Sequence, residues 1–232
     1  MSCILHIETS TDICSVALSQ DGQCLADKED RQGPSHASVL PGFVEEMLSF
    51  ADSHAIPLDA VAVSAGPGSY TGLRIGVSTA KGLCYGRDVK LIAVPTLELL
   101  CVNTLLFNEE MPDDALLCPM IDARRMEVYA ALYNRGLGVE RPIQADIVTA
   151  ETYQEYLEQH PVYFLGNGAE KCKKVITHPN AHFIDNQVPL ARYMMPLAER
   201  ALALGRVEDV AYYEPFYLKD FVAGTPKKSV LG

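Results

Sequence analysis

The chain has 232 residues, 48% of them hydrophobic and 21% charged, which is the composition of an ordinary globular protein with one large or two small domains. Its formal net charge of −11 repels phosphate backbones, so we expect no dominant binding of RNA or DNA by the chain alone. No hydrophobic run reaches the roughly 18 residues of a membrane span, and the N-terminus lacks the basic start of a signal peptide. These features predict a cytoplasmic protein.

The cysteines and histidines favour a reduced protein without a metal centre. Seven cysteines occur without a C-x-x-C pair, and several lie inside apolar stretches, which predicts buried thiols and no disulfide framework. His36 and His54 have no second ligand at a metal spacing.

The first thirty residues predict a hairpin. Residues 4–7 and 14–18 are the expected strands, and a polar turn over residues 8–12 joins them. Hydroxyl groups packed into a turn between strands can cradle a phosphate. An ordinary polar hairpin tip is the alternative interpretation. The turn begins with Glu8, Thr9, Ser10 and Thr11.

Residues 35–55 predict an amphipathic helix, because their apolar side chains recur at helical spacing. Pro41 either kinks this helix or belongs to its first regular turn. The apolar stripe consists of Leu40, Phe43, Val44, Met47, Leu48 and Ala51.

A second helix follows a glycine-rich turn. Residues 61–65 form a short apolar strand, the turn is Gly66-Pro67-Gly68, and a helix is expected from about Tyr70 with Ser69 as its N-cap. Free amides at such a turn suit an anion. The turn matches neither Walker A nor G-x-G-x-x-G, and glycines placed for close packing are the alternative.

Glycines also punctuate this second helix, although each costs roughly 1 kcal/mol relative to alanine. Gly72, Gly76 and Ala80 follow one another at i+4 and line one smooth face. We expect another element to approach the helix closely along that face.

The second half of the chain repeats the order of the first. Residues 108–114 are the best candidate boundary, and strands are expected at 115–121 and 127–133. A strand at 162–165 leads into Gly166-Asn167-Gly168, and helices are expected at 149–159, from 169 and at 190–204. The tail after residue 205 shows no periodicity.

This order of hairpin, strand, helix, strand and helix, given twice, predicts an α/β protein of two similar lobes. Each lobe is expected to be a mixed sheet with flanking helices, over residues 1–108 and 109–232. The last helix or the tail is expected to pack back on the first lobe. Sugar kinases, actin and the chaperone ATPases share such a layout.

Four segments carry a more specific resemblance. ILHIETSTDICSVAL, SHASVLP, SAGPGSYTGLRIGVSTAKGL and IDARRMEVYAALY together resemble the bacterial TsaB (YeaZ) family across nearly the whole chain. Near the end, EPFYLKD is similar to a Pro-x-Tyr-Leu-Arg element of that family, with Lys219 in the place of arginine.

The resemblance implies the actin/hexokinase-like fold and a part in making N6-threonylcarbamoyladenosine at position 37 of tRNAs that read ANN codons. It implies a non-catalytic subunit that supports TsaD, the metal-holding catalyst, in an assembly with the ATPase TsaE. It also implies a homodimer in isolation. From the net charge of −11 we expect contact with tRNA only through the complex, and from the hydropathy no membrane.

Two positions test whether this chain could itself be the catalyst. TsaD-type catalysts carry H-x-x-x-H after the strand that follows the glycine-rich helix. The two histidine positions fall here on Thr96 and Leu100, neither of which binds a metal as imidazole does. We therefore expect no catalytic residue and no metal in this chain.

The resemblance also locates two expected surfaces. Nucleotide loops of the fold would lie at Glu8, Thr9, Ser10, Thr11, Gly66, Gly68, Gly166 and Gly168. Such proteins usually have Asp where Glu8 stands, so we expect no cofactor and no tight binding of ATP or ADP. The partner interface is expected on the two first-lobe helices, at Leu40, Phe43, Val44, Met47, Gly72, Leu73, Gly76, Val77 and Ala80.

Two other functions stay open at this point. An ATP-dependent sugar or acyl-group kinase of the same fold would need a catalytic carboxylate after the glycine-rich loop, and no convincing one is present. A protease would need a nucleophile motif, but Ser69 follows GPG and not G-x-S-x-G.

Overall fold

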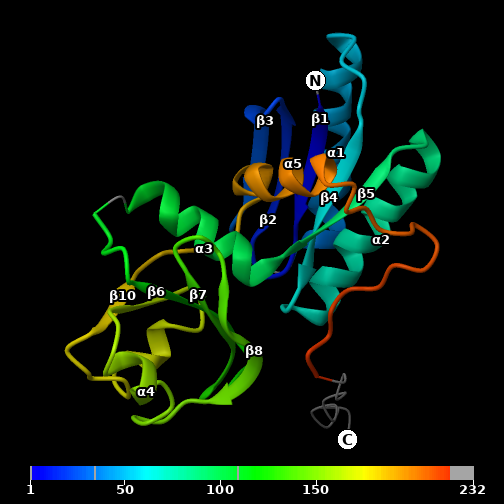
Figure 1. The fold of residues 1–232 in the computed structure, drawn as a ribbon. Coiled ribbons are helices and arrows are strands. Elements are labelled where there is room, and N and C mark those ends of the chain that lie inside the picture. Colours follow the sequence, from blue (N-terminus) through cyan, green and yellow to red (C-terminus); the bar gives the residue numbers. More distant parts are fainter. Residues whose placement is uncertain (1, 34, 109, 220–232) are drawn as a thin grey trace, which may run out of the picture.

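The protein consists of two lobes, each built on a five-stranded mixed sheet (Figure 1). The computed structural model describes residues 2–33, 35–108 and 110–219. The first sheet has the order β3-β2-β1-β4-β5, in which β4 and β5 run parallel to β1 and the other pairs are antiparallel. Its strands are β1 (Cys3–Glu8), β2 (Cys14–Gln20), β3 (Gln23–Asp30), β4 (Ala60–Gly66) and β5 (Lys90–Pro95).

The second sheet repeats this topology with the order β10-β9-β6-β7-β8. Again three antiparallel strands come first in the chain, and two parallel strands are added beside the first of them. The strands are β6 (Leu116–Asp122), β7 (Glu127–Asn134), β8 (Val139–Ile147), β9 (Val162–Leu165) and β10 (Ala181–Ile184). The prediction of a two-lobed actin/hexokinase-like fold is confirmed.

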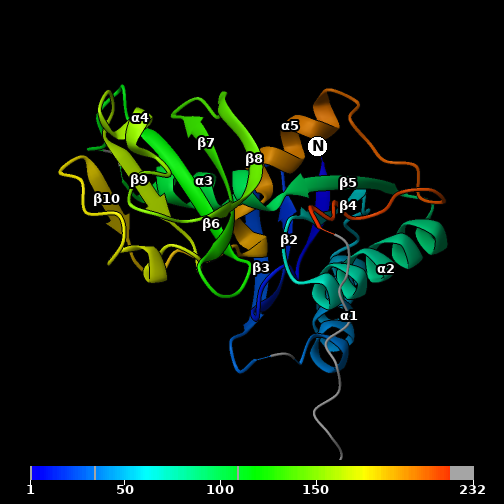
Figure 2. The same ribbon diagram turned by 90° about the horizontal axis from the view of Figure 1, so that it is seen from below.

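Helices cover both faces of the first sheet. Figure 2 shows α1 (His36–Ser53) and α2 (Tyr70–Arg87) side by side on one face and α5 (Met195–Ala203) on the other. The apolar stripe of α1 explains its orientation, because Leu40, Val44, Met47 and Ala51 are buried against the sheet. On the other face, Met194 and Ala198 pack on Ile4, Ala60 and Ile92.

Both first-lobe helices were expected from the sequence. Pro41 lies inside α1, in its first turns. The N-cap of α2 is Ser69, whose side chain accepts a hydrogen bond from the Gly72 amide at 3.2 Å. The helix ends where Asp88 takes the left-handed conformation.

The second lobe has less helix than the sequence pattern predicted. The helix expected at 149–159 is one turn, α4 (Gln154–Leu157), and the one expected from residue 169 is a single 3-10 turn at Glu170–Cys172. The final helix is also shorter, because Pro196 favours a new start and a 3-10 turn at Ala191–Tyr193 precedes it. The edge strand β3 was missed, since its polar, mostly exposed residues give no apolar pattern.

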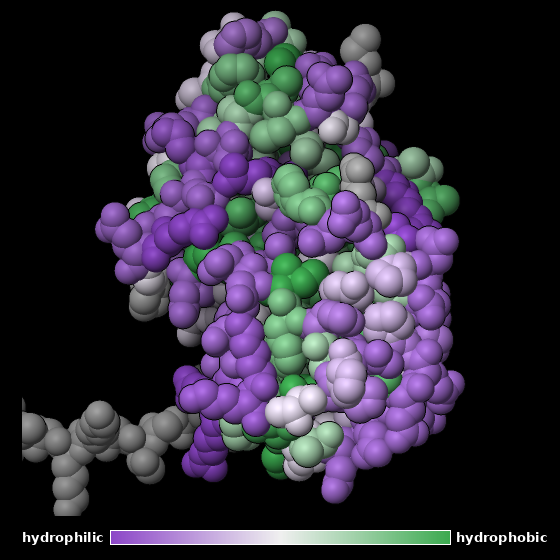
Figure 3. Space-filling view, turned by 90° about the vertical axis from the view of Figure 1, so that its left-hand side faces the viewer, coloured by the Kyte–Doolittle hydropathy of each residue, from purple (hydrophilic) through white to green (hydrophobic). Residues whose placement is uncertain are grey.

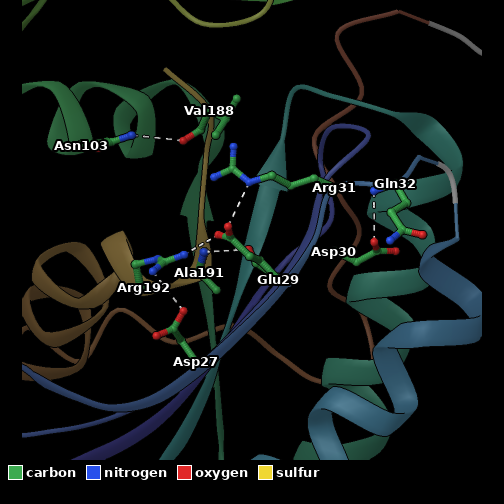
Figure 4. A network of polar contacts seen from close by, with 10 residues as sticks. Asp27, Glu29, Asp30, Arg31, Gln32, Asn103, Val188, Ala191 and Arg192 are labelled. Atoms are coloured by element: carbon green, nitrogen blue, oxygen red, sulfur yellow. Dashed lines mark hydrogen bonds and ion pairs between the residues drawn. The ribbon is translucent and has the colours of Figure 1, made fainter. Parts of the chain in front are cut away.

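Two connections join the lobes. Helix α3 (Thr96–Phe107) leads from β5 into the second lobe, and residues 185–194 lead back. Figure 4 shows this return, where Arg192 forms ion pairs with Asp27 and Glu29 of β3. Beside them the Ala191 amide donates to Ser15 Oγ at 2.9 Å. The chain after residue 190 is thereby fixed to the first sheet.

One side of the molecule shows a mostly hydrophilic surface. Figure 3 shows the side that lies on the left in Figure 1, where hydrophilic side chains cover most of the face and hydrophobic ones form a narrow band. Within the described ranges, no helix is long and apolar enough to cross a membrane. The seven cysteines are free thiols, and all except Cys24 are buried.

Candidate functional site

The turn between β1 and β2 packs directly against the glycine-rich loop and the start of α2. The Ser69 amide donates to the Ser10 carbonyl at 2.7 Å, and Thr9 Oγ1 donates to the Gly72 carbonyl at 2.8 Å. A Cβ on Gly72 would come within 2.1 Å of the Thr9 carbonyl oxygen, and one on Gly68 within 2.4 Å of the Ser10 carbonyl oxygen. The chain's own backbone therefore accounts for both glycines.

Glu8 lies fully buried at the base of this turn. Its Oε1 accepts a hydrogen bond from the Ser10 amide at 2.5 Å, while Oε2 has no hydrogen-bond partner among the described residues. Burial raises the pKa of the carboxyl group from 4.5 to about 7, although hydrogen bonds from Ser10 and Ser64 act in the opposite direction. The fold thus makes this carboxyl group harder to ionise than an exposed glutamate.

The carboxyl end of β4 is occupied by a later part of the chain. Gly66 has a left-handed φ of +101°, and a Cβ there would lie 2.6 Å from the Phe216 carbonyl oxygen. The Phe216 amide donates to the Ala65 carbonyl at 2.8 Å. Ligands of open α/β sheets bind beyond the carboxyl ends of the strands. In this protein residues 215–217 lie at that place.

The corresponding loop of the second lobe is also packed on its own sheet. Gly166 has a φ of +93°, and a Cβ there would lie 2.4 Å from the Met120 carbonyl oxygen. The Gly168 amide donates to the same carbonyl at 3.0 Å, and Asn167 Oδ1 accepts from the Asp122 amide at 2.9 Å. The two glycine loops occupy equivalent places after β4 and β9.

Thr96 and Leu100, the residues at the two histidine positions of the H-x-x-x-H pattern, lie at the start of α3. Thr96 is the first residue of α3, directly after β5, and both side chains are fully buried. Across the parts of the chain that the structure describes, no group of three or more His, Cys, Asp or Glu side chains is arranged to hold a metal ion.

Most of the side chains predicted for the partner interface lie in the core of the first lobe. The buried ones are Leu40, Val44, Met47, Gly72, Leu73, Gly76, Val77 and Ala80, and Phe43 is half-buried. In particular, a Cβ on Gly76 would lie 2.3 Å from Thr9 Oγ1. Apart from Phe43 and Val44, the accessible surface of α1 and α2 is formed by other residues.

The outer surface of these helices carries three glycines that the fold does not explain. A Cβ on Gly42, Gly82 or Gly86 would meet no atom within 4 Å. Tyr85, between the last two, is 87% exposed. A groove separates the helices, lined by Pro41, Val44, Glu45, Leu48, Ser49, Asp52, Thr79 and Arg87. The sequence analysis missed this outer face, although the i+4 spacing of Gly82 and Gly86 was visible.

Comparisons with known proteins agree with the architecture. A family model described as TsaD, tRNA N6-adenosine threonylcarbamoyltransferase, matches residues 31–226. The tRNA threonylcarbamoyladenosine biosynthesis protein TsaB of Escherichia coli K12 is 32% identical, over 95% of this chain and 96% of that protein. The Bacillus subtilis TsaB protein is 34% identical, over 75% of this chain and 74% of that one.

Solved structures show the same similarity. YeaZ from Pseudomonas aeruginosa superposes with a TM-score of 0.77 at 26% identity and covers 94% of this chain and all of that one. A second Pseudomonas aeruginosa structure, of a protein similar to peptidase YeaZ, gives a TM-score of 0.80. Because the family model spans residues 31–226 and the Escherichia coli TsaB protein is 32% identical over nearly the full length of both chains, the chain belongs to the TsaB group of the TsaD family.

Proposed function

We propose that this chain is a non-catalytic subunit that binds and supports a TsaD-type catalyst in forming N6-threonylcarbamoyladenosine at position 37 of tRNAs that read ANN codons. The observation that carries this proposal is the start of α3, where Thr96 and Leu100 are both buried. By the family resemblance, these two residues would stand where the catalyst has its metal-binding histidines. A hydroxyl and an isobutyl group cannot replace two imidazoles as ligands. The names of the Escherichia coli and Bacillus subtilis relatives support the pathway.

The packing of the glycine loops supports a role without tight nucleotide binding. An anion that used the Ser69 amide would have to displace the Ser10 carbonyl, because that amide is already satisfied. The carboxylate of Glu8 would add a negative charge nearby when ionised. The expected contacts of nucleotide with Thr9, Thr11 and the two glycine loops stay a prediction.

We propose that partners dock on the outer faces of α1 and α2. The side chains first predicted for this interface would act as the rigid support beneath it. Open space at Gly42 and Gly82 allows the backbone of another helix to approach closely, and Tyr85 offers a large exposed side chain. The same two helices of a second molecule, either the catalyst or another copy of this chain, would form a four-helix contact.

Other parts of the assembly follow from the same proposal. A TsaE-type ATPase would join the complex of the two paralogues. A chain with a net charge of −11 would meet tRNA only through that complex, in the cytoplasm.

Reconstitution tests the proposal directly. The purified chain, the TsaD-type paralogue of the same organism and TsaE would be incubated singly and together with tRNA and the threonylcarbamoyl-AMP ester. We expect no modified adenosine from this chain alone and more product when it joins the catalyst. Product from the pure chain, with traces of the catalyst excluded by mass spectrometry, would contradict a non-catalytic role.

A further inference from the structure

The last described residues run from one lobe to the other. After α5 the Glu208 amide donates to the Leu91 carbonyl of β5 at 2.8 Å, and the chain then passes along α2 and the carboxyl end of β4 (Figures 1 and 2). It reaches the second lobe at Lys219, which forms an ion pair with Glu127 of β7. We call residues 208–219 the strap.

The strap is held to the first lobe along most of its length. Lys81 of α2 donates from Nζ to the carbonyls of Ala211 and Tyr213, at 3.1 and 3.0 Å. The Tyr213 ring packs at the edge of the first core. A charged lysine that donates to two backbone carbonyls holds the chain at two points against α2.

The strap's second half adds further contacts with the first lobe. The amide of Phe216 is bonded to Ala65, as described for the β4 end. The centroids of the Tyr217 and Tyr70 rings lie 4.9 Å apart. The guanidinium carbon of Arg74 lies 4.8 Å from the centroid of the Tyr70 ring. These contacts involve the end of β4 and the beginning of α2.

The attachment to the second lobe is much weaker. Among the described residues, the strap has one ion pair with the second lobe, between Lys219 and Glu127. The side chains of this pair are 46% and 22% exposed. A partly exposed pair of this kind shifts an equilibrium by about fivefold at most, and salt screens it. Lys171 braces the receiving turn by donating to Asp122 Oδ1 and to the Glu127 carbonyl, both at 2.6 Å.

We propose that the strap is fixed to the first lobe and latched reversibly to the second through Lys219, and that it restrains the movement of the lobes about their two connections. It explains the segment Pro215-Phe216-Tyr217-Leu218-Lys219, which the proposed scaffold role leaves unused. The strap crosses the carboxyl end of β4, the place where ligands of open α/β sheets bind. A segment of the chain occupies that place.

Zero-length cross-linking tests the latch. A carbodiimide joins an amine to a carboxylate only where the two are in contact, and mass spectrometry identifies the joined peptides. We expect a Lys219–Glu127 product at low salt whose yield falls several-fold at 0.5 M salt. Lys81→Met, which frees the strap from α2, should lower this yield and leave the Lys28–Glu46 product of the first lobe unchanged. If the Lys81→Met variant gives as much Lys219–Glu127 cross-link as the wild type, the proposal that the strap acts as one unit is wrong.

Distances between spin labels test the restraint. Labels at Ser78→Cys and Lys174→Cys, both exposed positions, would report on the two lobes, with the exposed Cys24 changed to serine. We expect Lys219→Glu to raise the population of widely separated lobes up to about fivefold, and the double variant Lys219→Glu/Glu127→Lys to reverse the change.

Lys28→Glu is the matched control, because it removes an ion pair within the first lobe whose lysine is about as exposed as Lys219. Its distance distribution should equal that of the labelled parent. Identical distributions for Lys219→Glu and the parent, or a charge exchange that fails to restore the parent distribution, would overturn the restraint.

Discussion

Helix α2 carries glycines on two faces, and the two sets have different causes. On the inner face Gly72 and Gly76 lie against Thr9, so that a Cβ at either position would overlap its atoms. On the outer face Gly82 and Gly86 have open space around them. All four lie within one helix and carry a similar cost in helix propensity of roughly 1 kcal/mol.

This difference separates what the fold requires from what it leaves unexplained. The inner glycines allow the β1–β2 turn to approach the helix backbone. Nothing within the described chain requires the outer ones. A contact outside the chain would explain why they are not alanine, which is the reason for placing the partner there. Substitutions on each face should therefore have different effects on stability and on binding.

The largest effect is expected for Gly72→Ala. Its Cβ would come within 2.1 Å of a backbone oxygen, which cannot rotate away as the end of a side chain can. We expect a loss of about 3 kcal/mol in the free energy of unfolding, at the upper end for overpacked cores. Urea denaturation measures this loss. An unchanged urea midpoint for Gly72→Ala would show that the β1–β2 turn is loosely held. It would also mean that the inner and outer faces of α2 do not differ in packing.

The second-largest effect is expected from Glu8, at the base of the β1–β2 turn, on the dependence of stability on pH. The pKa of Glu8 is raised to about 7 in the folded protein, so the unfolded chain loses this proton first as the pH rises from 4.5. Stability should fall between about pH 4.5 and 7 and then level off, by an amount on the order of 2–3 kcal/mol. Glu8→Gln should remove this loss.

The measurement is urea denaturation of the wild type and Glu8→Gln at pH 4.5 and 8. The variant should be the more stable protein at pH 8 and similar to the wild type at pH 4.5. Glu45→Gln, at an exposed position on α1, is the control and should leave the pH profile unchanged. A wild type as stable at pH 8 as at pH 4.5 would argue that the Glu8 carboxylate finds an additional partner.

The inner face shows what the sequence could predict. The i+4 spacing of Gly72, Gly76 and Ala80 indicated a close approach, and the hairpin, both long helices and the repeated order of elements followed from apolar periodicity. The approaching element could not be identified, because the contact of Thr9 with Gly72 joins residues 63 positions apart. Long-range contacts of this kind leave no local signal.

Other features were beyond prediction for related reasons. An apolar stripe predicts that Val44 and Met47 face a core, but it does not tell the chain's own core from a partner. The strap has no periodicity, since single contacts of Lys81, Phe216 and Lys219 fix it in place of a repeating pattern. The short α4 also shows that a capping threonine and polar spacing do not ensure a long helix.

A third substitution tests the outer face as a docking surface. Gly82→Leu places a large side chain where the structure has open space, so the fold of the isolated chain should tolerate it. If a partner helix approaches there, affinity for the TsaD-type paralogue or for a second copy should fall at least tenfold. Isothermal titration and sedimentation velocity measure the two associations. Gly76→Leu is the contrasting variant, because it should lower the melting temperature.

Binding of Gly82→Leu at wild-type affinity would contradict docking at this position, and Tyr85→Ala would then test the neighbouring exposed ring. A lowered melting temperature for Gly82→Leu would instead contradict the open environment of the outer face.

The smallest expected effect is a gain in stability. Gly82→Ala adds a Cβ that meets no atom within 4 Å and lowers the conformational freedom of the unfolded chain. We expect the free energy of unfolding of the isolated chain to rise by about 0.5–1 kcal/mol. Gly76→Ala, with its Cβ 2.3 Å from Thr9 Oγ1, should lower the same free energy, because Thr9 would lose its hydrogen bond to Gly72 on moving aside. Urea denaturation of the two alanine variants side by side measures the difference between the faces. Stability changes of the same sign would mean that the surroundings of these glycines do not differ as the structure indicates.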